Sequence, residues 1–243
     1  MSDKNYISEW DMAWSDKDSL AWYPDEQVIR FLARYVAKKI GIKNDEIKYW
    51  GNQKPIGLDL GCGTGRNLLP MCELGIDTFG FDLSSVAINF LANWLNTKGL
   101  KANLSYGDIS TLPYPNDFFD FVVCHGVLDH MTKQTREKGL IEINRILKPG
   151  GFFFFSVISK SDSAFGFGDF LEDDTWVINE GFESNIPQAF FDINRVNDEF
   201  SNFNLINITQ ITQENLKGRS LIGSDKNYEK DDRFYIVASR PSQ

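Results

Sequence analysis

The run LDLGCGTGRNLLP at 58–70 places three glycines at alternate positions, Gly61, Gly63 and Gly65. Because glycine has no Cβ, such a run lets the chain turn sharply from a strand into a helix while its backbone approaches a ligand closely. The helix that follows would present free N–H groups and the positive end of its dipole to the loop. The run therefore predicts a slot for a nucleotide-like ligand.

Polar residues stand at the ends of the apolar segments that follow this run. Asp82 ends the second segment, where its carboxylate can accept both hydroxyl protons of a ribose. Asp108 ends the third and suits a hydrogen bond to an amino group, and Ile109 supplies an apolar neighbour for a ring. The fourth segment ends in Cys124 and His125. Ligands of open α/β sheets bind at the carboxyl ends of the strands, so we expect these side chains around one site.

Two details count against a nicotinamide cofactor. The glycine spacing puts Arg66 where the third glycine of a G-x-G-x-x-G fingerprint is expected. The Tyr-x-x-x-Lys pair of the sequence, Tyr35 and Lys39, precedes the glycine run, whereas a short-chain dehydrogenase would carry it well downstream.

Strand-like and helical segments alternate along the chain, which predicts an α/β fold with a parallel sheet covered on both faces. Short apolar stretches predict strands at 55–61, 78–84, 103–108, 119–125 and 152–158. A period of about 3.6 residues predicts helices at 24–40, 66–74, 84–95, 133–147 and 193–200. The closing strands expected at 204–212 and 233–239 indicate an antiparallel hairpin at one sheet edge.

We interpret the chain as a single domain, 1–243, with four parts. A helical and aromatic cap occupies 1–50, the ligand-binding core 51–158, and a C-terminal helix with the edge hairpin 189–243. Residues 159–188 are acidic, aromatic and irregular, and they are too long for an ordinary connection. This insertion is a candidate substrate lid, with a dimer contact or a surface loop as the alternatives.

Composition and charge limit the possible partners. The 25 Lys and Arg against 34 Asp and Glu give a net charge of −9, which disfavours nucleic acid and membrane surfaces as partners. The three cysteines lack disulfide-like or metal-like spacing, so we expect a reducing, cytoplasmic setting and no bound metal. The oligomeric state stays open between monomer and homodimer.

These motifs together resemble the class I S-adenosylmethionine-dependent methyltransferases of the small-molecule type. The match is close over 55–158, and it rests on LDLGCGTG at 58–65, FDLS at 81–84, GDISTLPYPNDFFDFVVC at 107–124 and RILKPGG at 145–151. The resemblance implies a Rossmann-like, doubly wound, mostly parallel seven-stranded sheet with an antiparallel C-terminal hairpin strand. It also implies S-adenosyl-L-methionine as the cofactor and S-adenosyl-L-homocysteine as the product.

The resemblance further implies a role for each motif residue. The first motif would surround the methionine part of the cofactor, the second would hold the ribose and adenine, and the third the adenine amino group. Cys124 and His125 would lie along the cofactor near the sulfonium. The residues implied are Asp59, Gly61, Cys62, Gly63, Gly65, Asp82, Leu83, Asp108, Ile109, Cys124 and His125.

The acceptor side of the site is indicated by histidines and aromatic residues. His130 or His125 is a candidate general base for a hydroxyl acceptor, with support of the active-site floor as the alternative role for His130. Four aromatic residues are candidate acceptor-binding residues, although those near the N-terminus could instead pack on the sheet; they are Trp10, Trp14, Phe165 and Trp176.

We therefore expect transfer of a methyl group by direct in-line displacement to a small or medium-sized acceptor with an oxygen or nitrogen nucleophile. Two other functions stay open. One is a non-catalytic, S-adenosylmethionine-binding regulatory protein, and the other is a nucleotide-dependent oxidoreductase.

Overall fold

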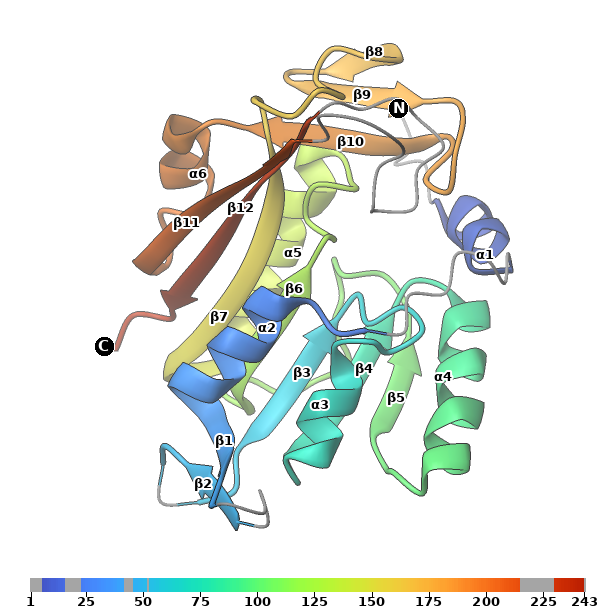
Figure 1. Ribbon diagram of the computed structural model, residues 1–243. Helices are drawn as coiled ribbons and strands as arrows, with labels where there is room; N and C mark the ends of the chain where they lie inside the picture. Colours follow the sequence, from blue (N-terminus) through green and yellow to red (C-terminus); the bar gives the residue numbers. More distant parts are fainter. Residues whose placement is uncertain (1–5, 16–22, 42–45, 52, 215–229, 243) are drawn as a thin grey trace.

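The computed structural model describes residues 6–15, 23–41, 46–51, 53–214 and 230–242. A central sheet runs through the molecule with helices on both of its sides, and a smaller sheet lies across the carboxyl ends of the central strands (Figure 1). Within this described part of the chain, none of the helices combines the length and the apolar character needed to cross a membrane.

Seven strands form the central sheet in the spatial order β5-β4-β3-β6-β7-β12-β11. The first five are parallel, and β12 runs antiparallel to both β7 and β11. This arrangement confirms the predicted mostly parallel sheet with an antiparallel hairpin strand, although residues 215–229 between β11 and β12 lie outside the described residues. The strands are β3 (Ile56–Leu60), β4 (Asp77–Asp82), β5 (Asn103–Tyr106), β6 (Phe119–His125), β7 (Leu147–Ser159), β11 (Asn204–Glu214) and β12 (Lys230–Ser239).

Helices cover both faces because the central strands are apolar on both. On β7, Phe153 and Phe155 pack in the same cluster as α5 and α6, whereas Phe154 packs with α2 and α3. Such continuous apolar runs are typical of parallel strands buried on both faces. The helices are α2 (Glu26–Phe31), α3 (Leu68–Glu73) and α4 (Ser85–Lys98), then α5 (Lys133–Ile146) and α6 (Ile193–Glu199).

The helix predicted over 24–40 is shorter than expected. It begins at Glu26 after the N-cap Asp25, and a π-helical turn ends it at Val36. Residues Ala37–Ile40 instead form strand β1, which pairs antiparallel with β2 (Glu46–Tyr49). The helical period over Ile40 was misleading because pairing with a later segment, a contact invisible to local pattern, decides the conformation.

Strand β7 begins at Leu147, before the expected start at 152. Leu147 pairs with Phe119, and the register then shifts before Phe152 pairs with Phe121. At the other end, His125, the last residue of β6, pairs with Ser156, so β7 extends beyond β6 to Ser159.

The insertion at 159–188 was predicted to be irregular, but it contains strands. β8 (Asp169–Glu172), β9 (Thr175–Ile178) and β10 (Ile186–Phe191) form an antiparallel unit, which we call the cap sheet. β10 pairs parallel with the last residues of β7, so the cap sheet lies over the carboxyl ends of the central strands (Figure 1). The chain leaves β7 and returns at adjacent points, because Lys160 N donates to Phe191 O at 2.7 Å.

Candidate functional site

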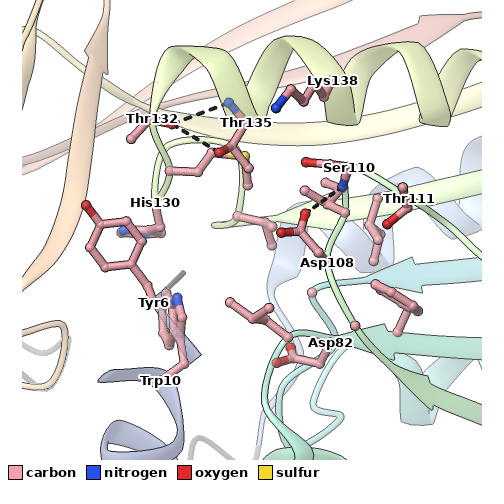
Figure 2. Close-up of a pocket in the computed structure, with 18 of the residues that line it drawn as sticks. Tyr6, Trp10, Asp82, Asp108, Ser110, Thr111, His130, Thr132, Thr135 and Lys138 are labelled. Carbon is pink, nitrogen blue, oxygen red and sulfur yellow. Dashed lines mark hydrogen bonds between the residues drawn. The ribbon is translucent and has the colours of Figure 1, made fainter. Parts of the chain in front are cut away.

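A cavity of about 290 Å³ lies at the carboxyl ends of β3, β4 and β6. Its walls come from the glycine loop, from the segments after β4, β5 and β6, from the start of α5, and from helix α1 (Ile7–Ser15). Figure 2 shows Tyr6, Trp10 and His130 at one end, and Asp108, Ser110 and Lys138 toward the other. The elements that carry the sequence motifs therefore meet at one cavity.

The glycine loop needs glycine for two separate reasons. Gly61 and Gly63 have φ values of +73° and +52°, a region that other residues rarely adopt. A Cβ on Gly61 would lie 2.2 Å from Val127 Cγ2, and one on Gly63 would lie 2.6 Å from Trp14 Cζ2. The loop is thus pressed between the segment after β6 and helix α1, with room for bare backbone alone.

Asp82 lines the cavity and ties the glycine loop to β4. Its two carboxylate oxygens accept hydrogen bonds from Gly63 N at 2.7 Å and from Ser84 N at 2.9 Å. Burial raises the pKa of Asp82 to about 6, although these hydrogen bonds act to lower it. Each oxygen keeps a lone pair, so the carboxylate can still accept from a ligand hydroxyl.

Asp59 lies buried beneath the loop. Its Oδ2 atom has no hydrogen-bond partner within the described residues. Burial, together with the nearby Asp82 carboxylate, raises the pKa of Asp59 to about 7. An unpaired, desolvated acceptor is an exception that calls for an explanation, and Asp59 precedes Leu60 and Gly61, which line the cavity.

The part of the cavity near Asp108 offers apolar side chains for a ring and a carboxylate for an amino group. Leu83 and Ile109 line it with apolar surface, and the exposed Asp108 accepts a hydrogen bond from Ser110 N at 2.7 Å. One Asp108 oxygen therefore stays available to a ligand.

The structure does not bring Cys124 or His125 to the cavity wall. Cys124 is fully buried in the core on the α5 side of the sheet, and burial raises the pKa of its thiol well above the usual range. His125 Nδ1 is 2.8 Å from Ser156 Oγ, and its ring stacks on Tyr235. Burial and the nearby Arg66 hold the pKa of His125 well below its usual range, so the ring is neutral. Four further predicted cofactor residues lie outside the lining: Asp59, Cys62, Gly63 and Gly65.

His130 lines the cavity and is 6% exposed. Its Nε2 atom lies 3.5 Å from Glu183 Oε1 and 3.9 Å from Asp129 Oδ1. Its Nδ1 atom has no partner within the described residues. Trp10 meets the imidazole edge-on at 5.9 Å. The ring therefore has both carboxylates close to one of its nitrogens, an arrangement suited to a proton acceptor.

Helix α1 brings Trp10 and Trp14, two of the candidate acceptor-binding residues, to the cavity. A carboxylate holds the helix in place: Asp11 Oδ1 accepts from Ser84 Oγ at 2.5 Å and from Val86 N at 3.4 Å. The anion stands at the N-terminus of α4, where the helix dipole favours negative charge.

The structure places Phe165 and Trp176, the other two candidate acceptor-binding residues, outside this cavity. Their rings meet at 4.9 Å and both contact Phe190, in a separate cluster that joins the cap sheet to the end of β7. The insertion reaches the cavity region through Phe182 instead, whose ring contacts Trp10 at 6.3 Å and Trp14 at 5.1 Å. The side chain of Trp176 packs against rings of the insertion and the cap sheet, and the composition of the insertion does not indicate this direction.

Several lining residues were missed in the sequence. Val127 and Met131 follow the fourth strand directly, in a segment that drew attention for its histidines alone. Tyr6 and Lys138 carry no motif, and their places depend on how α1 and α5 dock. Within the described ranges, no group of three or more His, Cys, Asp or Glu side chains is arranged to hold a metal ion.

Comparison with known sequences agrees with these features. A family profile described as a methyltransferase domain matches residues 58–155. The ubiquinone biosynthesis O-methyltransferase of Coxiella burnetii is 26% identical over 132 residues, which cover 54% of this chain and 51% of that protein. The chain spans about half the length of the curated relatives it matches.

Solved structures share the fold. An S-adenosylmethionine-dependent methyltransferase of Methanosarcina mazei gives a TM-score of 0.64 at 18% identity, covering 80% of this chain and 96% of that chain. The [4+2]-cyclase SpnF gives a TM-score of 0.64 at 14% identity, with 98% and 95% covered. Sequence identity at this level supports a common architecture and leaves the reaction to be argued from the site.

Proposed function

We propose that residues 58–155, which match a methyltransferase-domain profile, form a class I, Rossmann-like, S-adenosylmethionine-dependent methyltransferase domain. The chain would methylate a small or medium-sized acceptor through an oxygen or nitrogen nucleophile. The observation that carries the proposal is the pairing of the glycine loop with Asp82, which holds Gly63 N at 2.7 Å while it lines the cavity.

The residues present fit this cofactor. Asp82 would accept from the ribose hydroxyls, and Asp108 would accept from the adenine amino group between Leu83 and Ile109. The unpaired Oδ2 of Asp59 suits a donor on the methionine part. Six further residues would shape the slot and would not bind the cofactor through their side chains: Gly61, Cys62, Gly63, Gly65, Cys124 and His125.

In this reaction the protein forms no covalent bond with either reactant. S-adenosylmethionine supplies a methyl group that its sulfonium already activates. The cavity aligns the acceptor with that methyl group, and α1 with its tryptophans excludes water. His130 takes the proton from a hydroxyl or amine acceptor, and His125, neutral and buried, supports the turn that carries Gly126.

Calorimetric titration with S-adenosylmethionine tests the proposal. We expect binding to the wild type, and binding about 10–100-fold weaker to Asp82→Ala because a charged acceptor is lost. Asp198→Ala on the exposed part of α6 is the matched control, and circular dichroism checks that both variants fold. Wild-type affinity in Asp82→Ala would overturn the assignment.

A second function, cofactor binding without methyl transfer, has one observation in its favour. SpnF, whose structure this chain resembles, is described as a [4+2]-cyclase. Incubation with methyl-labelled S-adenosylmethionine and a fractionated small-molecule extract separates the two functions. Label in an acceptor supports methyl transfer, and tight binding with no labelled acceptor in any fraction supports the second function.

A further inference from the structure

One end of the cavity is walled by aromatic rings. Tyr6 and Trp10 line it (Figure 2). Trp14 also lines it, and the two indole rings stack with their centroids 6.3 Å apart. Phe182 from the insertion lies against both indoles. Flat, electron-rich walls of this kind bind flat apolar groups, and they attract cations toward the ring faces.

Two carboxylates stand beside His130 at this end, outside the residues that line the cavity itself. Glu183, next in sequence to Phe182, places Oε1 3.5 Å from His130 Nε2, and its Oε2 accepts from Gln188 Nε2 at 3.0 Å. Gln188 lies on β10 and is 7% exposed, so a buried amide fixes the glutamate. Asp129 is fully buried, and its Oδ1 has no hydrogen-bond partner within the described residues, although His130 Nε2 lies 3.9 Å away.

The cation beside these carboxylates is Arg233, which is paired with Asp129. Arg233 donates through Nη1 to Asp129 Oδ2 at 2.6 Å and to Ser156 Oγ at 3.3 Å. The other titratable groups facing His130 are Glu183 and the neutral His125. Among the described residues, Glu183 forms no direct ion pair with a lysine or arginine; its partner within 4.0 Å is His130, and Arg233 acts on it at longer range.

We propose that the acceptor is an amine carried on a flat apolar body, recognised by the aromatic walls and by the Glu183 carboxylate. The inference rests on the proposed function and narrows its acceptor from oxygen or nitrogen nucleophiles to amines. A carboxylate or phosphate acceptor would meet unfavourable charge, and a neutral alcohol would leave Glu183 without a charged partner.

The chemistry of such an acceptor balances with the residues present. The bound ammonium gives one proton to His130, and its nitrogen lone pair forms the bond to the methyl carbon. The carbon–sulfur bond breaks, and its electron pair stays on sulfur. Glu183 has a side chain that is 35% exposed, so it links His130 to solvent, where the proton is released.

Three indoles of similar size test the charge preference. We would titrate tryptamine, tryptophol and indole-3-propionate into protein saturated with S-adenosylhomocysteine. The expected order is the amine first, with about tenfold tighter binding than the carboxylate. Saturation is measured beforehand, so failure to bind S-adenosylhomocysteine counts against the proposed function and not against the acceptor class.

Glu183→Gln keeps the size of the side chain and removes its charge. We expect it to bind S-adenosylhomocysteine like the wild type. The ratio of its affinities for tryptamine and indole-3-propionate should fall about fivefold or more. Glu73→Gln, at an exposed position on α3, is the control and should keep the preference. Equal or tighter binding of the alcohol or carboxylate by the wild type, or binding of none of the three, overturns the proposal without recourse to a variant.

Discussion

Asp59 and Asp82 hold their charge at a cost, because both are buried under the glycine loop and each has a pKa well above the 3.8 of an ordinary aspartate. A fold optimised for stability alone would not keep Asp59 Oδ2 unpaired. The unpaired oxygen is understandable if a donor group of a ligand completes the site, since functional sites often account for such exceptions.

Asp59→Asn should therefore stabilise the free protein at higher pH. The folded state holds the Asp59 proton up to a pKa of about 7, whereas the unfolded chain releases it near 3.8, so the free energy of unfolding falls as pH rises between these values. We expect a gain of about 1–3 kcal/mol for Asp59→Asn at pH 8 and little gain at pH 4. Urea unfolding at both pH values measures it, with Asp198→Asn as the control. A gain that does not depend on pH would contradict this account.

At the scale of elements, helix α1 is held to the site by few contacts. It is nine residues long, and Ala13 is its buried residue. Short helices are marginal by themselves, so tertiary contacts must hold α1 over the cavity. Asp11, bound to Ser84 Oγ and Val86 N, supplies the polar part of that attachment.

Asp11→Ala should loosen α1 and speed release of the cofactor. Loss of a carboxylate at a helix N-terminus costs about 0.5–2 kcal/mol, which corresponds to a roughly 2- to 30-fold faster dissociation rate. Stopped-flow fluorescence of S-adenosylhomocysteine release measures the rate. Met12→Ala on the same helix, where the side chain is 76% exposed, should leave it unchanged. Equal rates for Asp11→Ala and the wild type would show that Asp11 does not hold the helix.

Elements were predictable where the signal is local. The apolar runs of β3 and β6 and the period of α5 are set by neighbours in sequence, and the structure confirms them. β1 was missed because its residues continue the helical period of the segment before it, and β10 was missed because it pairs with β7 across the insertion. The candidate site shows the same difference. Asp82 could be predicted because it belongs to a sequence motif, whereas Glu183 could not, because its position beside His130 depends on how the chain runs between β9 and β10.

At the scale of the whole molecule, three separate segments close on one cavity. The central sheet supplies the floor, α1 supplies the indoles, and the insertion supplies Phe182 behind them. A ligand in the cavity touches residues that belong to different parts of the fold, so its binding should stabilise the molecule as a unit.

Saturating S-adenosylhomocysteine should raise the melting temperature. At a ligand concentration 100 times Kd the stabilisation is about 2.7 kcal/mol, which corresponds to about 5–10 °C for a chain of this size. Differential scanning calorimetry measures the shift, and Asp82→Ala at the same ligand concentration should show much less. No shift in the wild type at saturation would mean that the ligand does not select the folded state.

The cap sheet leaves β7 and returns toward α6 through positions that are one hydrogen bond apart, Lys160 N to Phe191 O. A segment whose ends meet in this way can be exchanged for another without moving the strands that flank it. Acceptor choice can then diverge among descendants of one ancestor while cofactor binding is inherited intact. For protein engineering, residues 161–185 are the part that can be exchanged, because Ala189 and Phe191 of β10 pack in the core.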